Sequence, residues 1–79
     1  MKIPRDLLGR DLARALCAKW SYQKVNQVGS HIILQTETPG HHRVSIPDHK
    51  PLRIGTLNAI LRELAAAKGV TREEILASL

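Results

Sequence analysis

Four aliphatic residues in the last third of the chain repeat with the period of a helix. Their spacing of i, i+3, i+4 and i+7 places side chains on one face of an α-helix. These residues are Leu57, Ile60, Leu61 and Leu64. Thr56 is placed to cap the start of this helix, and Gly69 suits the position just past its end. The pattern predicts a helix with one buried stripe, and that stripe needs a partner surface.

An earlier segment carries a second helical pattern, from Gly9 to about Trp20. Its apolar residues recur every four positions, which is typical of an amphipathic helix. They are Leu8, Leu12, Leu16 and Trp20, with Ala15 expected on the same face. Asp6 is a better N-cap candidate than Leu8 or Gly9. Trp20 is expected in the core.

A third, short helix is predicted from about Thr71 to Leu79. Thr71 and Glu74 have the spacing of a capping box, in which a side chain at the helix start accepts a backbone hydrogen bond. Val70 and Ile75 have the spacing of a hydrophobic staple.

Between the first two helices the composition changes to Val, Ile, Thr, Tyr and Gln, which favour strands. Gly29-Ser30 separates the run Tyr22–Val28 from a second run that begins at His31, and this predicts a hairpin. Thr38-Pro39-Gly40 supplies the next turn. Arg43–Ile46 is then a third strand with Val44 and Ile46 facing inward, and Pro47 ends it or confines it to a sheet edge.

This order of elements predicts an α+β fold. One domain, residues 1–79, should contain a small antiparallel three-stranded sheet with helices packed on one face, in the order α-β-β-β-α plus a short C-terminal helix. The other face of the sheet should stay open to solvent.

The charge of the chain indicates its kind of partner. Twelve Lys and Arg against seven Asp and Glu give a net charge of +5, so a polyanion or an acidic protein is the expected partner. No run approaches the roughly 20 apolar residues that span a bilayer, and the opening residues lack the apolar region of a signal peptide. We therefore expect a cytoplasmic protein without a membrane partner. The single cysteine, Cys17, is expected to be a small buried hydrophobic residue.

The sequence lacks the motifs of several catalytic classes. It has no Gly-x-Ser-x-Gly elbow, no glycine-rich phosphate loop and no cysteine pair for zinc. We expect neither a metal nor a cofactor. The side chains that titrate near neutral pH are the four histidines, His31, His41, His42 and His49.

The four histidines differ in context. His41 and His42 follow Pro39-Gly40 in a turn and are expected to face water. His49 is either a surface residue or a second member of an RNA site, and the sequence does not separate these alternatives. His31 begins a strand and should project away from the core, opposite to Ile32. A histidine in such a position is more often structural than catalytic, so its position alone assigns no function.

Taken together, these features resemble the HicA toxin family, also called YcfA-like, over nearly the whole chain. The matching segments occur in the order and spacing of the family. They are Lys2–Leu7, Gly9–Leu12, Gly29–Ile32, Ile46–Pro47 with His49, and Gly55–Leu57 with Ile60–Arg62.

The resemblance implies a fold similar to a double-stranded-RNA-binding domain and an endoribonuclease that cleaves mRNA. It implies that His31, in the motif Gly29-Ser30-His31, is the catalytic residue. Gly29 would permit a backbone conformation forbidden to larger residues and leave space for RNA. A HicB-type antitoxin is the implied protein partner, in a hetero-oligomer that covers the site.

A ribonuclease of this kind also needs cations near the phosphate. Lys24, Arg43 and Lys50 are the candidates for this role. Two alternatives remain at this point. One is a module that binds structured RNA without cutting it, and the other is an interaction protein whose basic surface only docks an acidic partner.

Overall fold

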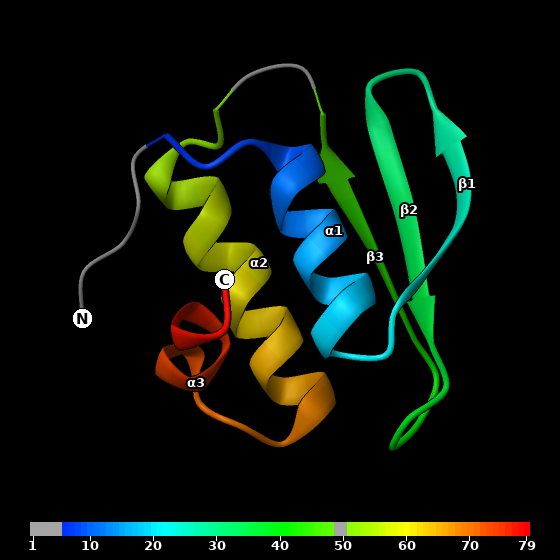
Figure 1. The fold of residues 1–79 in the computed structure, drawn as a ribbon, viewed down its shortest axis with the longest axis vertical. Helices are drawn as coiled ribbons and strands as arrows, with labels where there is room; N and C mark the ends of the chain where they lie inside the picture. The colour runs from blue at the N-terminus through cyan, green and yellow to red at the C-terminus, as the bar shows by residue number, and fades with distance from the viewer. Residues whose placement is uncertain (1–5, 49–50) are drawn as a thin grey trace.

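The helices and strands follow the predicted order and confirm the α+β class. The computed structural model describes residues 6–48 and 51–79. The elements of this part of the chain are α1 (Gly9–Lys19), β1 (Gln23–Val28), β2 (His31–Thr36), β3 (His42–Pro47), α2 (Ile54–Lys68) and α3 (Arg72–Ala77) (Figure 1). Within the described residues, every helix is too short or too polar to pass through a lipid bilayer.

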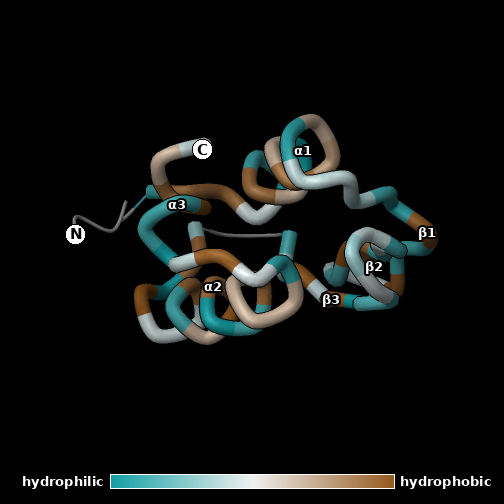
Figure 2. Tube along the Cα trace, turned by 90° about the horizontal axis from the view of Figure 1, so that it is seen from below, coloured by the Kyte–Doolittle hydropathy of each residue, from teal (hydrophilic) through white to brown (hydrophobic). Residues whose placement is uncertain are grey.

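The three strands form one antiparallel sheet with β2 in the centre. Ile32 and Leu34 of β2 are buried, and so are their partners Ile46 and Val44 in β3. These four side chains face the helices, which gather on one side of the sheet in Figure 2. The alternation predicted for β2 and β3 is therefore confirmed. Pro47 is the last residue of β3, which is an edge strand, as its missing N–H requires.

The core is almost wholly aliphatic. Both long helices, the last helix and two strands contribute to it, and no phenylalanine is present in the chain. Its buried hydrophobic residues are Leu12, Ala13, Leu16, Tyr22, Ile32, Leu34, Val44, Ile46, Leu52, Leu57, Ile60, Leu61, Leu64 and Ile75. Trp20 lies at the edge of this core and is only partly buried, because its indole Nε1–H donates a hydrogen bond of 2.7 Å to Ser78 Oγ.

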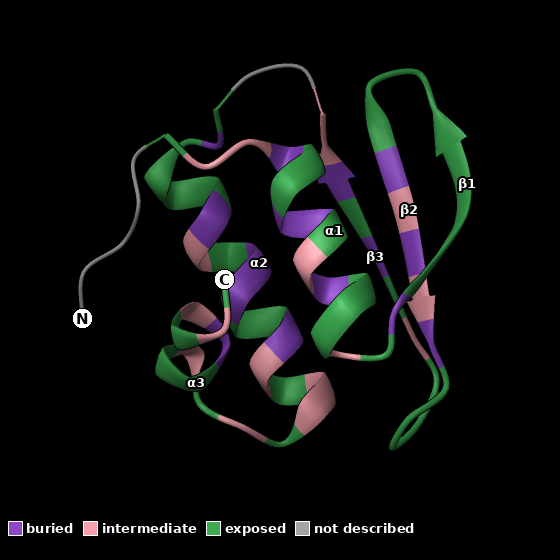
Figure 3. Cartoon of the chain, viewed as in Figure 1, coloured by how far each residue is buried: buried purple, intermediate pink, exposed green. Residues whose placement is uncertain are grey.

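Strand β1 buries none of its six residues, and Figure 3 shows it as exposed along its length. Val25 and Val28 are 46% and 59% exposed. The pairing with β2 is irregular between Lys24 and Asn26, where a bulge interrupts the ladder. The prediction that this strand begins at Tyr22 was wrong. Tyr22 precedes β1 and is buried in the core, where its backbone N–H donates a hydrogen bond of 3.3 Å to the Leu16 carbonyl of α1.

Helix α1 begins with an unusually close contact. A Cβ atom added at Gly9 would lie 1.6 Å from the carbonyl oxygen of Pro47, at the end of β3. Only glycine permits this approach of helix backbone to strand backbone. The N-cap is Leu8, whose extended backbone is stabilised by no side-chain hydrogen bond, so the prediction of Asp6 was wrong.

The buried face of α1 also differs from the prediction. Ala13 is buried and Ala15 only partly so, which turns the stripe slightly around the helix. Cys17 is exposed, and the expectation that it is buried was wrong. It follows the buried Leu16 by about 100° around the helix and therefore points past the stripe that packs on the sheet.

Helix α2 starts earlier than its apolar pattern indicates. Its first residue is Ile54 and its N-cap is Arg53, whose carbonyl accepts the Leu57 N–H at 2.8 Å. The prediction of Thr56 as the cap was therefore wrong, since Thr56 lies inside the first turn. At the other end, Gly69 adopts φ +67° as the left-handed C-cap, which confirms its predicted role.

The capping box predicted for α3 is confirmed in its main contact, because Thr71 Oγ1 accepts the Glu74 N–H at 3.1 Å. Ile75 is fully buried, and Val70 packs against the same core.

A polar cluster closes the end of the sheet where β2 ends and β3 begins. The Tyr22 hydroxyl lies 2.8 Å from His42 Nδ1, and His42 Nε2 lies 3.3 Å from a Glu63 carboxylate oxygen. Lys68 Nζ donates to Thr36 Oγ1 at 2.9 Å and lies 4.8 Å from the centroid of the Tyr22 ring. Burial, together with the negative charge of Glu63, raises the pKa of Tyr22 to about 12.

This cluster corrects one histidine prediction. His41 is exposed as expected, and its Nδ1 lies 2.9 Å from Glu37. His42 does not face water freely, because only 18% of its side chain is exposed. It pairs with the buried Thr36 and lies in phase with Val44 and Ile46, so it points toward the helices.

Replacing Gly9 by alanine should destabilise the protein by about 3 kcal/mol or more, because the added methyl group collides with backbone that cannot move aside cheaply. The measurement is the free energy of unfolding in urea. Gly55→Ala in α2 is the matched control. A Cβ there meets no atom within 4 Å, so we expect no loss and a gain of up to about 1 kcal/mol. A Gly9→Ala protein as stable as the wild type would contradict the close contact.

Tyr22 is the only tyrosine, so tyrosinate absorbance reports its ionisation directly. In the native protein the midpoint should lie near pH 12, against about 10 in the denatured chain. Because folding raises this pKa, the stabilising contribution is complete below pH 10 and falls as the pH rises from 10 to 12. A native midpoint at the denatured value would show that the hydroxyl is not held in a desolvated contact.

Candidate active site

The Gly29-Ser30 turn joins β1 to β2 and precedes the candidate catalytic histidine. Val28 pairs with His31 across this two-residue connection. Gly29 has φ +58°, in the left-handed region that side chains disfavour. A Cβ added there would meet no atom within 4 Å. The backbone conformation therefore favours glycine, and the surface over the turn is open.

His31 is the first residue of β2 and is exposed. Its neighbour Ile32 is buried on the helix side of the sheet, so the imidazole lies on the opposite, helix-free face. The cross-strand partners of His31 are Val28 on β1 and Pro47 on β3. The predicted projection of His31 away from the core is confirmed, and its ring is accessible to a large substrate.

Several segments distant in sequence meet at this end of the sheet. In Figure 1 the β1–β2 turn, the end of β3 and the start of α1 all lie at the top of the view. The Asp48 N–H donates a hydrogen bond of 2.6 Å to the Ser30 carbonyl, which ties the chain after β3 to the turn. The contact between Gly9 and the Pro47 carbonyl ties α1 to the same place.

An ion pair completes this assembly. Arg10 Nε lies 3.5 Å from Asp48 Oδ1, and the two side chains are 60% and 21% exposed. Asp48 Oδ1 itself is buried and accepts no hydrogen bond from the described residues. Neither Arg10 nor Asp48 stood out in the sequence. The only signal was that Arg10 lies within the segment Gly9–Leu12 and Asp48 directly after Ile46–Pro47, two segments that resemble the family.

The predicted cations lie in different places. Arg43 shares the free face with His31, but it pairs with Gln35, four residues or about 13 Å along the sheet. Its guanidinium donates to Gln35 Oε1 at 2.8 and 3.2 Å. Lys24 pairs with the buried Leu34 and therefore lies on the helix side of the sheet, not on the face of His31.

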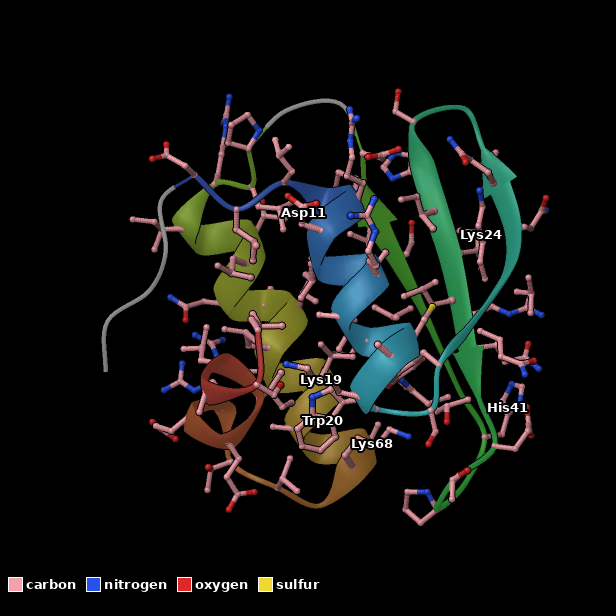
Figure 4. All side chains as sticks on the ribbon, in the orientation of Figure 1. Asp11, Lys19, Trp20, Lys24, His41 and Lys68 are labelled. Carbon is pink, nitrogen blue, oxygen red and sulfur yellow. The ribbon has the colours of Figure 1, made fainter. Side chains whose placement is uncertain are left out.

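Lys24 is engaged locally on that side, where its Nζ donates to Gln27 Oε1 at 2.8 Å. Figure 4 shows its side chain on β1, and shows His41 at the end of the sheet remote from the β1–β2 turn. The structure therefore brings Gly29, Ser30 and His31 together and keeps Lys24 and Arg43 apart from them. His49 and Lys50 lie outside the described residues.

Metal-binding residues are not grouped in the part of the chain that the structure describes. No three of its His, Cys, Asp and Glu side chains converge as potential ligands. The arrangement at the turn instead offers an exposed imidazole, an open backbone and, next to Asp48, a guanidinium. These are groups that can move a proton and bind an anion.

Comparison with known proteins identifies the family. A family model described as "HicA toxin of bacterial toxin-antitoxin" matches residues 9–65, which is more than half of the chain. No curated protein and no solved structure matches this chain. The matched span includes α1, the whole sheet and most of α2, and thus every element that meets around His31. The chain belongs to the HicA toxin family of bacterial toxin-antitoxin systems.

Proposed function

We propose that this toxin is a metal-independent endoribonuclease that cleaves mRNA, with His31 as its catalytic residue. The observation that carries the proposal is the exposed imidazole on the free face of the sheet, directly after a turn that only glycine can make without strain. Membership in the HicA family supports a toxic activity held in check by an antitoxin.

The proposed chemistry uses a nucleophile that RNA itself supplies. His31 takes the proton of a ribose 2′-hydroxyl, and the oxygen attacks the adjacent phosphorus. The bond from phosphorus to the 5′ oxygen breaks, and that oxygen receives a proton, which leaves a 2′,3′-cyclic phosphate and a 5′-hydroxyl. A histidine can act as the base in the first transfer or as the acid in the second, because imidazole exchanges protons near neutral pH.

The surface favours recognition of the RNA backbone over stacking on bases. Readers of single strands stack bases on exposed aromatic rings. The two aromatic residues of this chain are not positioned to stack on bases, since Tyr22 is only 2% exposed and Trp20 packs at the core edge. The net charge of +5 attracts phosphates instead. Structured or backbone-contacted RNA is therefore the proposed substrate.

We further propose that the antitoxin is of the HicB type and that it inhibits by covering the His31 end of the sheet. A toxin with a net charge of +5 is complementary to an acidic partner. An open site on one exposed face can be blocked by a single docked protein in a hetero-oligomer. The proposed substrate, mRNA, places this activity in the cytoplasm.

Replacing His31 by alanine should lower the rate of RNA cleavage by about 10²- to 10⁴-fold, the usual contribution of one positioned acid or base. The measurement is cleavage of a defined mRNA by the purified proteins in excess EDTA. The histidine is exposed, so the thermal unfolding of the variant should match that of the wild type. The RNA fragments that the wild-type protein produces should carry 2′,3′-cyclic phosphate ends.

His41→Ala is the matched control, because His41 is also exposed but lies at the other end of the sheet. It should cleave like the wild type. If the wild type and His31→Ala bind RNA equally and neither cuts it, the chain is a binding module and the enzyme proposal is wrong. If the wild type neither binds nor cuts RNA, the basic surface serves only to dock a protein partner. Cleavage that EDTA abolishes would contradict the metal-independent mechanism.

A further inference from the structure

Arg10 is joined to the candidate site by a short series of contacts. Its guanidinium Nε lies 3.5 Å from Asp48 Oδ1. The backbone N–H of Asp48 donates to the carbonyl of Ser30, which immediately precedes His31. An arginine in the first turn of α1 is thus linked, through one residue after β3, to the turn that carries the histidine.

The position of Asp48 in these contacts is strongly constrained. Its backbone is fixed by the hydrogen bond of 2.6 Å to Ser30, and the preceding Pro47 pairs with His31. Pro47 is also in close contact with Gly9, the residue next to Arg10. Asp48 Oδ1 is buried and has no hydrogen-bond partner among the described residues. The guanidinium is its countercharge there, and the carboxylate in turn limits where the guanidinium can lie.

Arg10 retains donors for a second anion. A guanidinium has five N–H groups in a planar fork, and the contact of Arg10 with Asp48 is made by Nε. The Arg10 side chain is 60% exposed, so more than half of its surface remains open to solvent. This fork matches the geometry of a phosphodiester, to which arginine can donate two parallel hydrogen bonds.

Three other described cations near the sheet, Lys24, Arg43 and Arg14, have different positions. Lys24 lies, like α1 itself, on the helix side of the sheet, and its Nζ is engaged by Gln27, whereas Arg43 is engaged by Gln35 further along the free face. Arg14 is on the same helix as Arg10, one turn further from the candidate site, and lies 3.8 Å from Asp11. Of these four cations, Arg10 is linked through Asp48 to Ser30, the residue before His31.

We propose that Arg10 binds a phosphate of the RNA backbone beside the bond that His31 cleaves, and that Asp48 is the positioning residue that orients Arg10. This inference rests on the proposed ribonuclease function and adds an RNA-binding residue to it. Phosphate contacts fix the register of RNA on a protein without reading its sequence. Arg10 would thus set which phosphodiester reaches His31.

Binding is tested without cleavage in the His31→Ala background, with a fluorescein-labelled RNA hairpin as the probe. Adding Arg10→Ala should weaken binding about tenfold, as loss of one charged contact does. It should also reduce the slope of log affinity against log salt by about one. Arg14→Ala removes the same charge from the same helix and should change affinity by less than about twofold, since that side chain is exposed and remote from the turn.

Equal losses for Arg10→Ala and Arg14→Ala would overturn the inference, because they would mean that only the total charge of α1 matters. Arg10→Lys separates charge from geometry. The Arg10→Lys variant should restore the slope of log affinity against log salt but not the full cleavage rate. An ammonium group cannot donate two parallel hydrogen bonds to one phosphate as a guanidinium can. Unchanged cleavage by Arg10→Ala would also overturn the inference.

Asp48→Asn gives a test in which two explanations predict opposite signs. Removing a negative charge should tighten RNA binding if simple attraction dominates. If Asp48 orients Arg10, the substitution should instead weaken RNA binding and lower the cleavage rate, and it should have little effect on either when Arg10 is already alanine. The asparagine keeps the backbone N–H that holds Ser30. A faster or unchanged enzyme would show that Asp48 does not position Arg10.

The outcomes separate the inference from the proposed function. If the wild type cleaves RNA and Arg10→Ala matches it in binding and cleavage, the inference alone is wrong. If the wild type does not cleave, but Arg10→Ala weakens binding selectively, the ribonuclease proposal is wrong and Arg10 is still an RNA contact.

Discussion

The candidate site depends on the close approach of two backbones. At Gly9 the first turn of α1 lies against the carbonyl of Pro47, closer than any side-chain-bearing residue permits. This contact sets the height of the helix over the sheet and brings Arg10 to Asp48. Asp48 in turn holds the turn before His31. The absence of a side chain at Gly9 therefore affects both the packing of α1 and the geometry of the surface residue His31 on β2.

Much of the fold follows from local periodicity and could be predicted from the sequence. The apolar residues of α2 repeat with a helical period, and Ile32, Leu34, Val44 and Ile46 alternate as a half-buried sheet requires. Gly69 and Thr71 mark a helix end and a helix start by capping chemistry alone. The exposure of His31 also follows from alternation, because its direction is set by the buried Ile32 beside it.

The remaining features depend on contacts between distant segments. The partial burial of His42 depends on contacts with Tyr22, in the segment before β1, and with Glu63 of α2, although its phase with Val44 and Ile46 could be seen in the sequence. The exposure of Cys17 depends on how α1 is rotated over the sheet. At the candidate site, the alternation of side chains along β2 predicted the direction of His31. It did not show that Lys24 lies on the opposite face of the sheet. The register of β1 at its bulge decides which face receives Lys24. Nor could Arg10 be placed there, because its contact is with Asp48, 38 residues further along the chain.

Strand β1 contributes hydrogen bonds to the sheet and no side chain to the core. Its sequence is therefore only weakly constrained by the stability of the protein, since a substitution there opens no cavity and buries no polar group. Residues next to the Gly29-Ser30 turn can change in charge and shape while the aliphatic core behind β2 and β3 stays as it is. A toxin built this way can adapt its exposed strand during evolution to new targets or new antitoxins at little thermodynamic cost.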